Sequence, residues 1–300
     1  MPDSQDLLLR FLLPDAGVRG VAVRLDDTWQ AMAERADYPP AVGELLGEAA
    51  AAAALFTAHA KVDGRLSVQL RSSGALRTLF AECTAAGTLR GIARLEEGAP
   101  PPSRDLAALG ADAMLAITIE NPARGRQEPM RYQGLVSLDA DNLGDAFEGY
   151  FRQSEQLPTR LLLACDGQRA AGVMLQKLPG DGGDEDGWNR AGALFETLGP
   201  AELLGTEPAA LVHRLFHEEA PALVGEKPLS FACSCSRARV EAMLVSLGRE
   251  EAMAAVEAGP GDDALVRCEF CGQEYRFDAG QVEALFHAPG TRAPAPAGLQ

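Results

Sequence analysis

Four cysteines in the last quarter of the chain are the residues whose type and spacing point to chemistry. Cys233 and Cys235 form a C-x-C motif in "FACSCSRARV", and Cys268 and Cys271 form a C-x-x-C motif in "CEFCGQ", with 32 residues between the two motifs. Four thiolates suit a tetrahedral Zn(II) in a closed structural site. Gly272 directly follows the last thiol, and a turn of this kind, a zinc knuckle, commonly presents two ligands. The pattern predicts one Zn(II) per chain in the reduced state.

The C-x-C half differs from a plain zinc ribbon, which uses C-x-x-C twice. A disulfide between Cys233 and Cys235 would close a small, strained ring, and strained disulfides are labile. Thiolates that an oxidant can reach are open to oxidation, which would expel the metal. Structural zinc contributes on the order of 10 to 16 kcal/mol, whereas a whole domain is stable by about 5 to 15 kcal/mol. Loss of the metal should therefore unfold the unit that holds it.

Local signals around the cysteines predict the elements that position them. Ser236 is placed to cap a helix in "RARVEAMLVSLG", and a second short helix is expected in "REEAMAAVEAG". Strands are predicted in "ALVRCEF" and "QEYRF", on either side of the C-x-x-C motif. Asp278 followed by Gln281 resembles a capping box for a last helix.

Composition and hydrophobic patterning divide the 300 residues into four parts. We expect an α+β core domain over 1–178, a metastable helical linker over 179–230, a zinc-binding unit over 231–288 and a flexible tail over 289–300. The boundary near residue 179 is marked by the Gly- and Asp-rich run "PGDGGDEDG". The last boundary is marked by a Pro- and Ala-rich composition.

The first segment combines alternating strands with few helices. Period-two alternation in "VAVRL", "LSVQL", "LRGIARL" and "LAITI" predicts half-buried strands. Because these strands cluster rather than alternate strictly with helices, the pattern favours α+β over a doubly wound sheet. The run "LLGEAAAAAALFTAHA", Leu45 to Ala60, is apolar on nearly every side and too short to span a membrane. We expect a helix buried inside the fold.

The linker combines apolar helix faces with a high acidic charge. Residues 181–230 hold ten acidic side chains against Arg190, Arg214 and Lys227, a net charge of −7. Apolar surface kept soluble by acidic charge is suited to binding unfolded chains once it is exposed. The candidate client-binding residues are Trp188, Leu194, Phe195, Leu198, Leu215 and Phe216.

Charge and motifs argue against several other classes of protein. The formal net charge is −16 and no Lys- or Arg-rich run occurs, so neither nucleic acid nor an anionic membrane is an expected partner. The N-terminal residues lack the basic leader of a signal peptide, which favours a cytoplasmic location. The absence of a P-loop, GxGxxG or GxSxG motif predicts a protein that is not an enzyme. Cys83 and Cys165 lie in apolar contexts and are expected to be buried structural cysteines.

Two other interpretations of the cysteines stay open at this level. The first is a zinc-ribbon protein whose metal is purely structural and which binds a protein or nucleic-acid partner. The second is a thiol-disulfide oxidoreductase, which would place its C-x-x-C motif at a helix N-terminus to lower the pKa of one thiol. Here "CEFC" lies between strand patterns, which disfavours the second interpretation.

The chain resembles the heat-shock protein 33 family, the oxidation-activated 33 kDa chaperonins. The resemblance rests on "FACSCSRARVEAMLVSLGREE" and "VRCEFCGQEYRFDAGQVEALF", and it extends upstream through "LVHRLFHEE", "YFRQSEQLPTRLLLA", "YQGLVSL" and "VGELLGEAAAAAALFTAHAKVDGRLSVQL". These segments follow one another in order and cover nearly the whole chain.

The resemblance implies a redox-regulated, ATP-independent holdase that prevents aggregation of unfolding client proteins under oxidative stress. It implies an inactive reduced state with zinc on Cys233, Cys235, Cys268 and Cys271, and oxidised disulfides joining Cys233 to Cys235 and Cys268 to Cys271. It further implies homodimerisation on oxidation. For the fold it implies a three-layer β/α/β N-terminal domain with a buried helix, in agreement with the expectation for residues 45–60.

Overall fold

The computed structural model describes residues 6–60, 62–123, 128–180 and 183–287. The chain divides into two compact units, Met1–Ala232 and Cys233–Gln300. Residues 183–230, most of the expected linker, belong to the first unit. The expected tail, 289–300, lies outside the described residues.

The first unit contains two sheets, and the second contains a two-stranded hairpin. The strands of the first unit are β1 (Leu7–Leu13), β2 (Val18–Leu25), β3 (Arg65–Arg71), β4 (Leu76–Thr84), β5 (Thr88–Leu95), β6 (Met114–Asn121), β7 (Met130–Val136), β8 (Thr159–Cys165), β9 (Ala170–Lys177), β10 (Ala222–Pro228) and β11 (Ser230–Phe231). Those of the second unit are β12 (Asp263–Arg267) and β13 (Glu274–Asp278). The four strands expected from alternation are confirmed as parts of β2, β3, β5 and β6.

Helices and helical turns accompany the sheets of the first unit, and further helices accompany the hairpin of the second. Those of the first unit are α1 (Asp27–Ala33), α2 (Pro40–His59), the 3-10 turn η1 (Leu106–Leu109), α3 (Leu143–Tyr150), the π-helical turn η2 (Phe151–Glu155), α4 (Gly187–Glu196), α5 (Pro200–Gly205), α6 (Pro208–Phe216) and the 3-10 turn η3 (His217–Glu219). Those of the second unit are α7 (Arg237–Leu247), α8 (Arg249–Glu257) and α9 (Ala279–His287).

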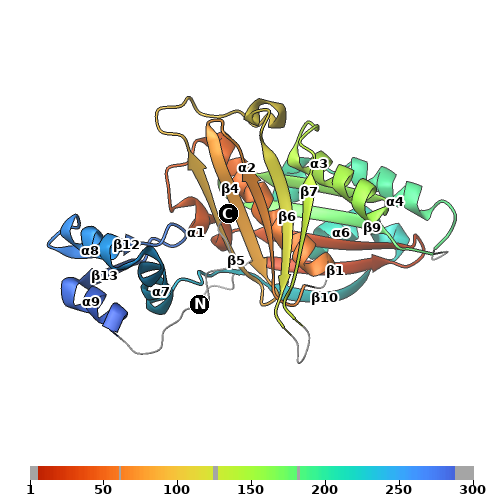
Figure 1. Cartoon of the computed structure of the whole chain (residues 1–300). Coiled ribbons are helices and arrows are strands. Elements are labelled where there is room, and N and C mark those ends of the chain that lie inside the picture. The colour runs from red at the N-terminus through yellow and green to blue at the C-terminus, as the bar shows by residue number, and fades with distance from the viewer. Residues whose placement is uncertain (1–5, 61, 124–127, 181–182, 288–300) are drawn as a thin grey trace. The chain divides into compact units, whose positions relative to one another are not determined.

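Two sheets enclose a central helix in the first unit (Figure 1). The five-stranded sheet has the order β10-β1-β2-β9-β8, and the six-stranded sheet has the order β11-β5-β4-β3-β6-β7. Neighbouring strands pair antiparallel, except that β11 pairs parallel to β5. Helix α2 packs against strands of both sheets. The expected three-layer β/α/β arrangement with a buried helix is confirmed.

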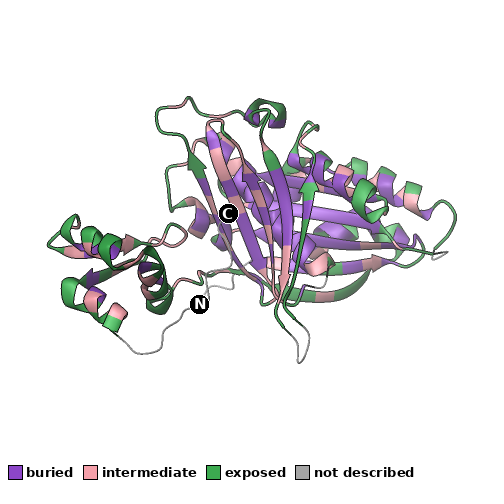
Figure 2. Cartoon of the chain, in the orientation of Figure 1, coloured by how far each residue is buried: buried purple, intermediate pink, exposed green. Residues whose placement is uncertain are grey.

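Helix α2 is buried because most of its side chains are apolar, and those at its centre are small. The alanines from Ala49 to Ala54 are fully buried (Figure 2). Its length and hydropathy would also suit a membrane span, but 78% of the apolar window is buried inside the protein, which is typical of a core helix. Glycines on both sheets allow the strands to approach α2 closely. A Cβ on Gly172 of β9 would lie 2.8 Å from Leu55, and one on Gly91 of β5 would lie 3.2 Å from Leu46.

The second face of the five-stranded sheet is covered by α4, α5 and α6. Phe11 of β1 stacks on Phe216 of α6 with ring centroids 6.0 Å apart. Arg190 of α4 bonds Glu219 at 2.8 Å and Asp184 at 2.7 Å. The expected linker segment is therefore ordered against the core domain by both apolar packing and ion pairs.

This segment also contains a strand that the sequence did not indicate. β10 pairs with β1 at the edge of the five-stranded sheet, and the chain then continues into β11, which pairs with β5 of the other sheet. Between the two strands the backbone N–H of Leu229 donates to Asp6 O at 3.0 Å. Residues 222–231 therefore connect the two sheets immediately before the second unit begins. The segment "ALVGEKP" contains a glycine, two charged residues and a proline, so it lacks the alternation of apolar and polar residues that predicts a strand.

The second unit has a small core of its own. Its buried apolar side chains are Val240, Leu244, Ala252, Val256, Ala264, Phe277 and Val282. Ser236 caps α7 by accepting from the backbone N–H of Arg239 at 3.2 Å, as expected. The expected capping box is also present, because Asp278 Oδ1 accepts from the Gln281 N–H at 2.8 Å and Gln281 Oε1 accepts from the Asp278 N–H at 3.3 Å.

Glu48 is an ionisable group inside the apolar layer. It lies on α2 with 3% of its surface exposed, and Arg104 donates to its carboxylate and also pairs with Glu44 at 2.5 Å. Burial raises the pKa of Glu48 from 4.5 to about 7, and Arg104 offsets only part of this effect. The helix therefore carries a carboxyl group that holds its proton to near neutral pH.

We expect Glu48→Gln to become more stable relative to the natural chain as the pH rises from about 4.5 to about 7. The unfolded chain ionises in this window while the folded chain keeps the proton, so the natural protein loses on the order of 2 to 3 kcal/mol across it. Urea unfolding followed by tryptophan fluorescence measures this, because Trp29 and Trp188 both lie in the first unit. Glu44→Gln, which removes the less buried partner of Arg104, is the matched control. Parallel pH curves for the natural chain and Glu48→Gln would contradict the expectation.

Candidate metal centre

The four cysteines of the two motifs meet in the second unit. Their Sγ atoms all lie within 4.8 Å of one another. Two of the separations cross between the motifs: Cys233 Sγ to Cys268 Sγ is 3.6 Å and Cys235 Sγ to Cys271 Sγ is 3.3 Å. Zn–S bonds of about 2.3 Å in a tetrahedron place sulfurs roughly 3.8 Å apart. The arrangement is thus that of a four-thiolate metal site, and the residues present could hold a metal ion.

Local backbone structure presents the four sulfurs. Cys233 and Cys235 immediately precede the capped start of α7, and the N–H of Cys235 points to Cys233 Sγ at 3.4 Å. Cys268 and Cys271 lie in the turn between β12 and β13. There the Gly272 N–H donates to Cys268 O at 2.7 Å, and Gly272 has φ 72°, a conformation that glycine adopts at little cost. The turn is closed by a bond from the Cys268 N–H to Gln273 O at 2.9 Å.

The electrostatics of the cluster favour a bound cation. The Tyr275 hydroxyl donates to Cys235 Sγ at 3.2 Å and lowers the pKa of that thiol to about 7. Burial instead raises the pKa of Cys271 to about 12 and also raises that of Cys233. Four adjacent thiolates repel one another, so full deprotonation requires a positive charge among them. A bound metal ion would supply that charge.

Tyr275 is a site residue that the sequence analysis missed. It lies on β13, four residues beyond Cys271, and its hydroxyl contacts a sulfur of the other motif. A hydrogen bond from outside the ligand set orients a ligand and tunes its charge. Its position in the hairpin that carries the knuckle is the one signal that could have suggested this role.

The other two cysteines are separate from the centre. Cys83 of β4 and Cys165 of β8 are both buried, as expected. Burial raises the pKa of Cys83 to about 11 and that of Cys165 to about 12, so neither is a reactive thiolate at neutral pH. The C-x-x-C motif lies in a strand-to-strand turn rather than at a helix start, which speaks against the oxidoreductase interpretation.

The six candidate client-binding residues precede the cysteine motifs and belong to the first unit. Phe195, Leu198, Leu215 and Phe216 are buried, and Trp188 and Leu194 are partly buried against the same cluster. They pack on the face of the five-stranded sheet that is turned away from α2. In this structure they form an internal surface.

An α+β core with a buried helix, followed by a small unit that holds four clustered cysteines, defines a two-part protein with a separate cysteine centre. The family model described as Hsp33 protein matches residues 6–278. The chain belongs to the Hsp33 family.

Similar proteins cover almost the whole chain. The 33 kDa chaperonin of Ectopseudomonas mendocina is 42% identical, over 96% of this chain and 98% of its own length. That of Nitrosococcus oceani is 41% identical, over 95% of both chains. The crystal structure of the 33 kDa chaperonin from Thermotoga maritima matches with a TM-score of 0.74 and 19% identity, covering 94% of this chain and 98% of that one, which shows the shared fold. Membership of this family supports a chaperone function.

We expect Tyr275→Phe to weaken metal binding by about tenfold while leaving the stoichiometry at one ion per chain, because the hydrogen bond to Cys235 is lost but all four sulfurs remain. Cys268→Ser should weaken binding much further, since a thiolate ligand is removed. Competition between the protein and a chromophoric chelator for Zn(II) measures both effects. Cys83→Ala is the matched control and should bind as the natural chain does. Tight, stoichiometric binding by Cys268→Ser would contradict the assignment of the ligands.

Proposed function

We propose that this protein is a redox-regulated, ATP-independent holdase that binds unfolding proteins and prevents their aggregation under oxidative stress. The observation that carries the proposal is the cluster of four cysteines within 4.8 Å in a unit of its own. The family membership and the apolar surface beneath α4 to α6 support it. In this proposal the reduced, zinc-bound protein is inactive, and oxidation activates it.

The metal we assign to the centre is Zn(II), one ion per reduced chain. Four sulfur donors in a closed site favour a soft or borderline cation with tetrahedral preference, and zinc is the usual one. The ion would be held by Cys233, Cys235, Cys268 and Cys271. It would stabilise the second unit, whose buried core is small.

Oxidation would convert the four ligands into two disulfides. A peroxide accepts two electrons for each disulfide and is reduced to water, and a disulfide sulfur no longer holds the metal. Every sulfur lies within 4.8 Å of the others, so proximity alone does not select the pairs. From the family resemblance we propose Cys233 with Cys235 and Cys268 with Cys271. Peptide mapping of the oxidised chain separates these from the cross-motif pairs.

Unfolding of the second unit would release the segment that precedes it. Cys233 follows β11 after one intervening residue, and β11 is joined to β5 by a two-residue ladder. Upstream, residues 183–230 are held by packing on the five-stranded sheet and by the ion pairs of Arg190. This segment is acidic, and its charge disfavours compact packing once the anchor at its end is lost.

Release would expose two complementary apolar surfaces. One is formed by the linker residues Trp188, Leu194, Phe195, Leu198, Leu215 and Phe216. The other is the sheet face that they cover, which includes Leu9, Phe11, Leu13, Val173 and Leu175. Large apolar surface bounded by charge is suited to binding unfolded chains of varied sequence. We propose that clients bind to this newly exposed surface.

The remaining partners follow from the same proposal. The oxidised protein would form a homodimer and would act in the cytoplasm on partly folded client proteins. With a formal net charge of −16 it would bind neither nucleic acid nor membranes. Holding a client requires no bond to be made or broken, so the protein would not act as an enzyme.

The decisive experiment records zinc release and suppression of client aggregation on one sample. The reduced, zinc-loaded chain is treated with hydrogen peroxide at raised temperature, and a thermally unfolding client is then added. Zinc release and aggregation suppression should appear together and should both be reversed by reductant with zinc. Zinc release without suppression of client aggregation would indicate that the metal has a purely structural role, and it would favour the zinc-ribbon alternative.

We expect Phe216→Ala to suppress client aggregation without oxidant. Phe216 is fully buried against Phe11, and its loss should cost about 3 to 5 kcal/mol of the packing that holds the linker on the sheet. Aggregation assays under reducing conditions, with hydrogen exchange of residues 183–219, measure activity and release together. Leu223→Ala, in the same segment but 54% exposed, is the control and should stay inactive. A released linker without aggregation suppression would show that the covered surface does not bind clients.

A further inference from the structure

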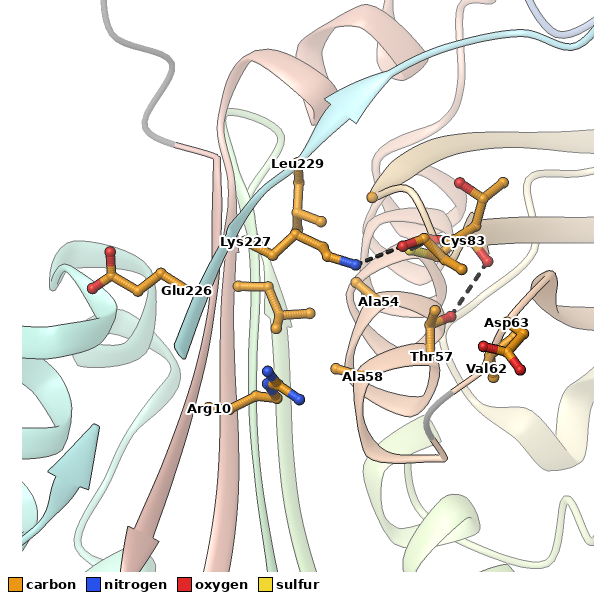
Figure 3. A pocket seen from close by; sticks show the side chains of 14 residues that line it. Arg10, Ala54, Thr57, Ala58, Val62, Asp63, Cys83, Glu226, Lys227 and Leu229 are labelled. Carbon is orange, nitrogen blue, oxygen red and sulfur yellow. Dashed lines mark hydrogen bonds between the residues drawn. The ribbon is translucent and has the colours of Figure 1, made fainter. Parts of the chain in front are cut away.

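A cavity of about 260 Å³ lies in the first unit between the C-terminal half of α2 and the strands β1 and β10 (Figure 3). Part of its lining is apolar and buried, formed by Leu8, Ala54, Val62 and Leu229. The cavity is separate from the cysteine centre, which belongs to the other unit. Nothing in the proposed chaperone function makes use of it.

Two cations reach this cavity from neighbouring strands. Figure 3 shows Arg10 of β1 and Lys227 of β10 directed toward α2. Arg10 pairs with Gly225 across the two strands, next to an irregularity in the register. A Cβ on Gly225 would lie 3.3 Å from Nη2 of Arg10, so the glycine leaves room for the guanidinium. The Lys227 ammonium donates to Ala85 O at 2.5 Å, which holds it at the cavity wall.

The Arg10 guanidinium is available to bind a ligand. Among the described residues it has no hydrogen bond or ion pair, although the chain carries 43 acidic side chains against 27 basic ones. The carboxylate of Glu226 points away from the cavity, and that of Asp63 lies across it, beyond the end of α2 (Figure 3). Guanidinium groups bind carboxylates through paired, charge-assisted hydrogen bonds. The cavity therefore combines a partly apolar lining with an exposed guanidinium that no described residue pairs with.

We propose that this cavity binds a small amphipathic anion, of the class of medium-chain carboxylates. The carboxylate would lie on Arg10 with Lys227 beside it, and the alkyl chain would lie on Leu8, Ala54 and Leu229. At roughly 30 Å³ for each water molecule, the cavity has room for about nine waters, which suits a ligand of about ten non-hydrogen atoms. Octanoate has this size and charge.

The test is calorimetric titration of octanoate into the reduced, full-length protein. We expect saturable binding at one site per chain. Arg10→Ala should weaken it by about tenfold or more, because a charge-assisted pair is lost. Ala58→Leu should also weaken it, because the larger side chain fills the cavity without changing any charge. Arg131→Ala is the control: it removes the same charge from β7, at the far edge of the six-stranded sheet, and should bind normally.

Two further measurements keep the result unambiguous. Thermal unfolding followed by tryptophan fluorescence shows that each variant is folded before it is titrated. Octylammonium carries the same alkyl chain with the opposite charge and should not bind at this site. The proposal is overturned if octanoate shows no saturable binding, if Arg10→Ala binds as tightly as the natural chain, or if octylammonium binds equally well.

Discussion

The five-stranded sheet is apolar on both faces, and both faces must be covered for the first unit to fold. Leu8, Val21 and Val23 face α2, whereas Leu9 and Phe11 face the opposite way. The first face is covered by α2, which the second sheet encloses from its other side. Among the described residues, the other face is covered by α4, α5 and α6, which lie in the acidic segment that follows β9. In the proposed function, this cover would be removable, so the chaperone could hide or expose the apolar face beneath it.

In the proposed function, the second unit would control whether that face stays covered. Seven buried apolar residues form its core, which is little for an independent domain, so a metal bound by four sulfurs would supply much of its stability. In the proposed function, the same four atoms are those that an oxidant would attack. Stability and sensitivity to oxidation would then depend on one cluster. Cys233 follows β11 after one residue, so unfolding of the second unit would begin next to the residues that join both sheets.

Charge acts on the two proposed binding surfaces in opposite ways. Around the linker, an excess of carboxylates would keep exposed apolar side chains soluble while leaving them free to contact a client. At the cavity beside α2, two cations meet in a chain of strongly negative charge, and one of them has no partner among the described residues. A local cation of this kind selects small anions rather than extended polypeptides. The two surfaces are thus suited to different ligands.

The sequence by itself determined the features that arise from spacing within a few residues. Alternation placed the strands, the largely apolar run of Leu45 to Ala60 indicated a buried helix, and the two cysteine motifs indicated the four thiols that the structure clusters. Ser236 and Asp278 likewise marked helix starts, because capping bonds join residues three apart. Only the tertiary structure revealed the pairing of β10 with β1, the hydrogen bond of Tyr275 to Cys235, the burial of the linker side chains against the sheet, and the convergence of Arg10 with Lys227. These features join segments that are separated along the chain or lie on different strands, and which side chains meet there depends on topology and register rather than on local periodicity.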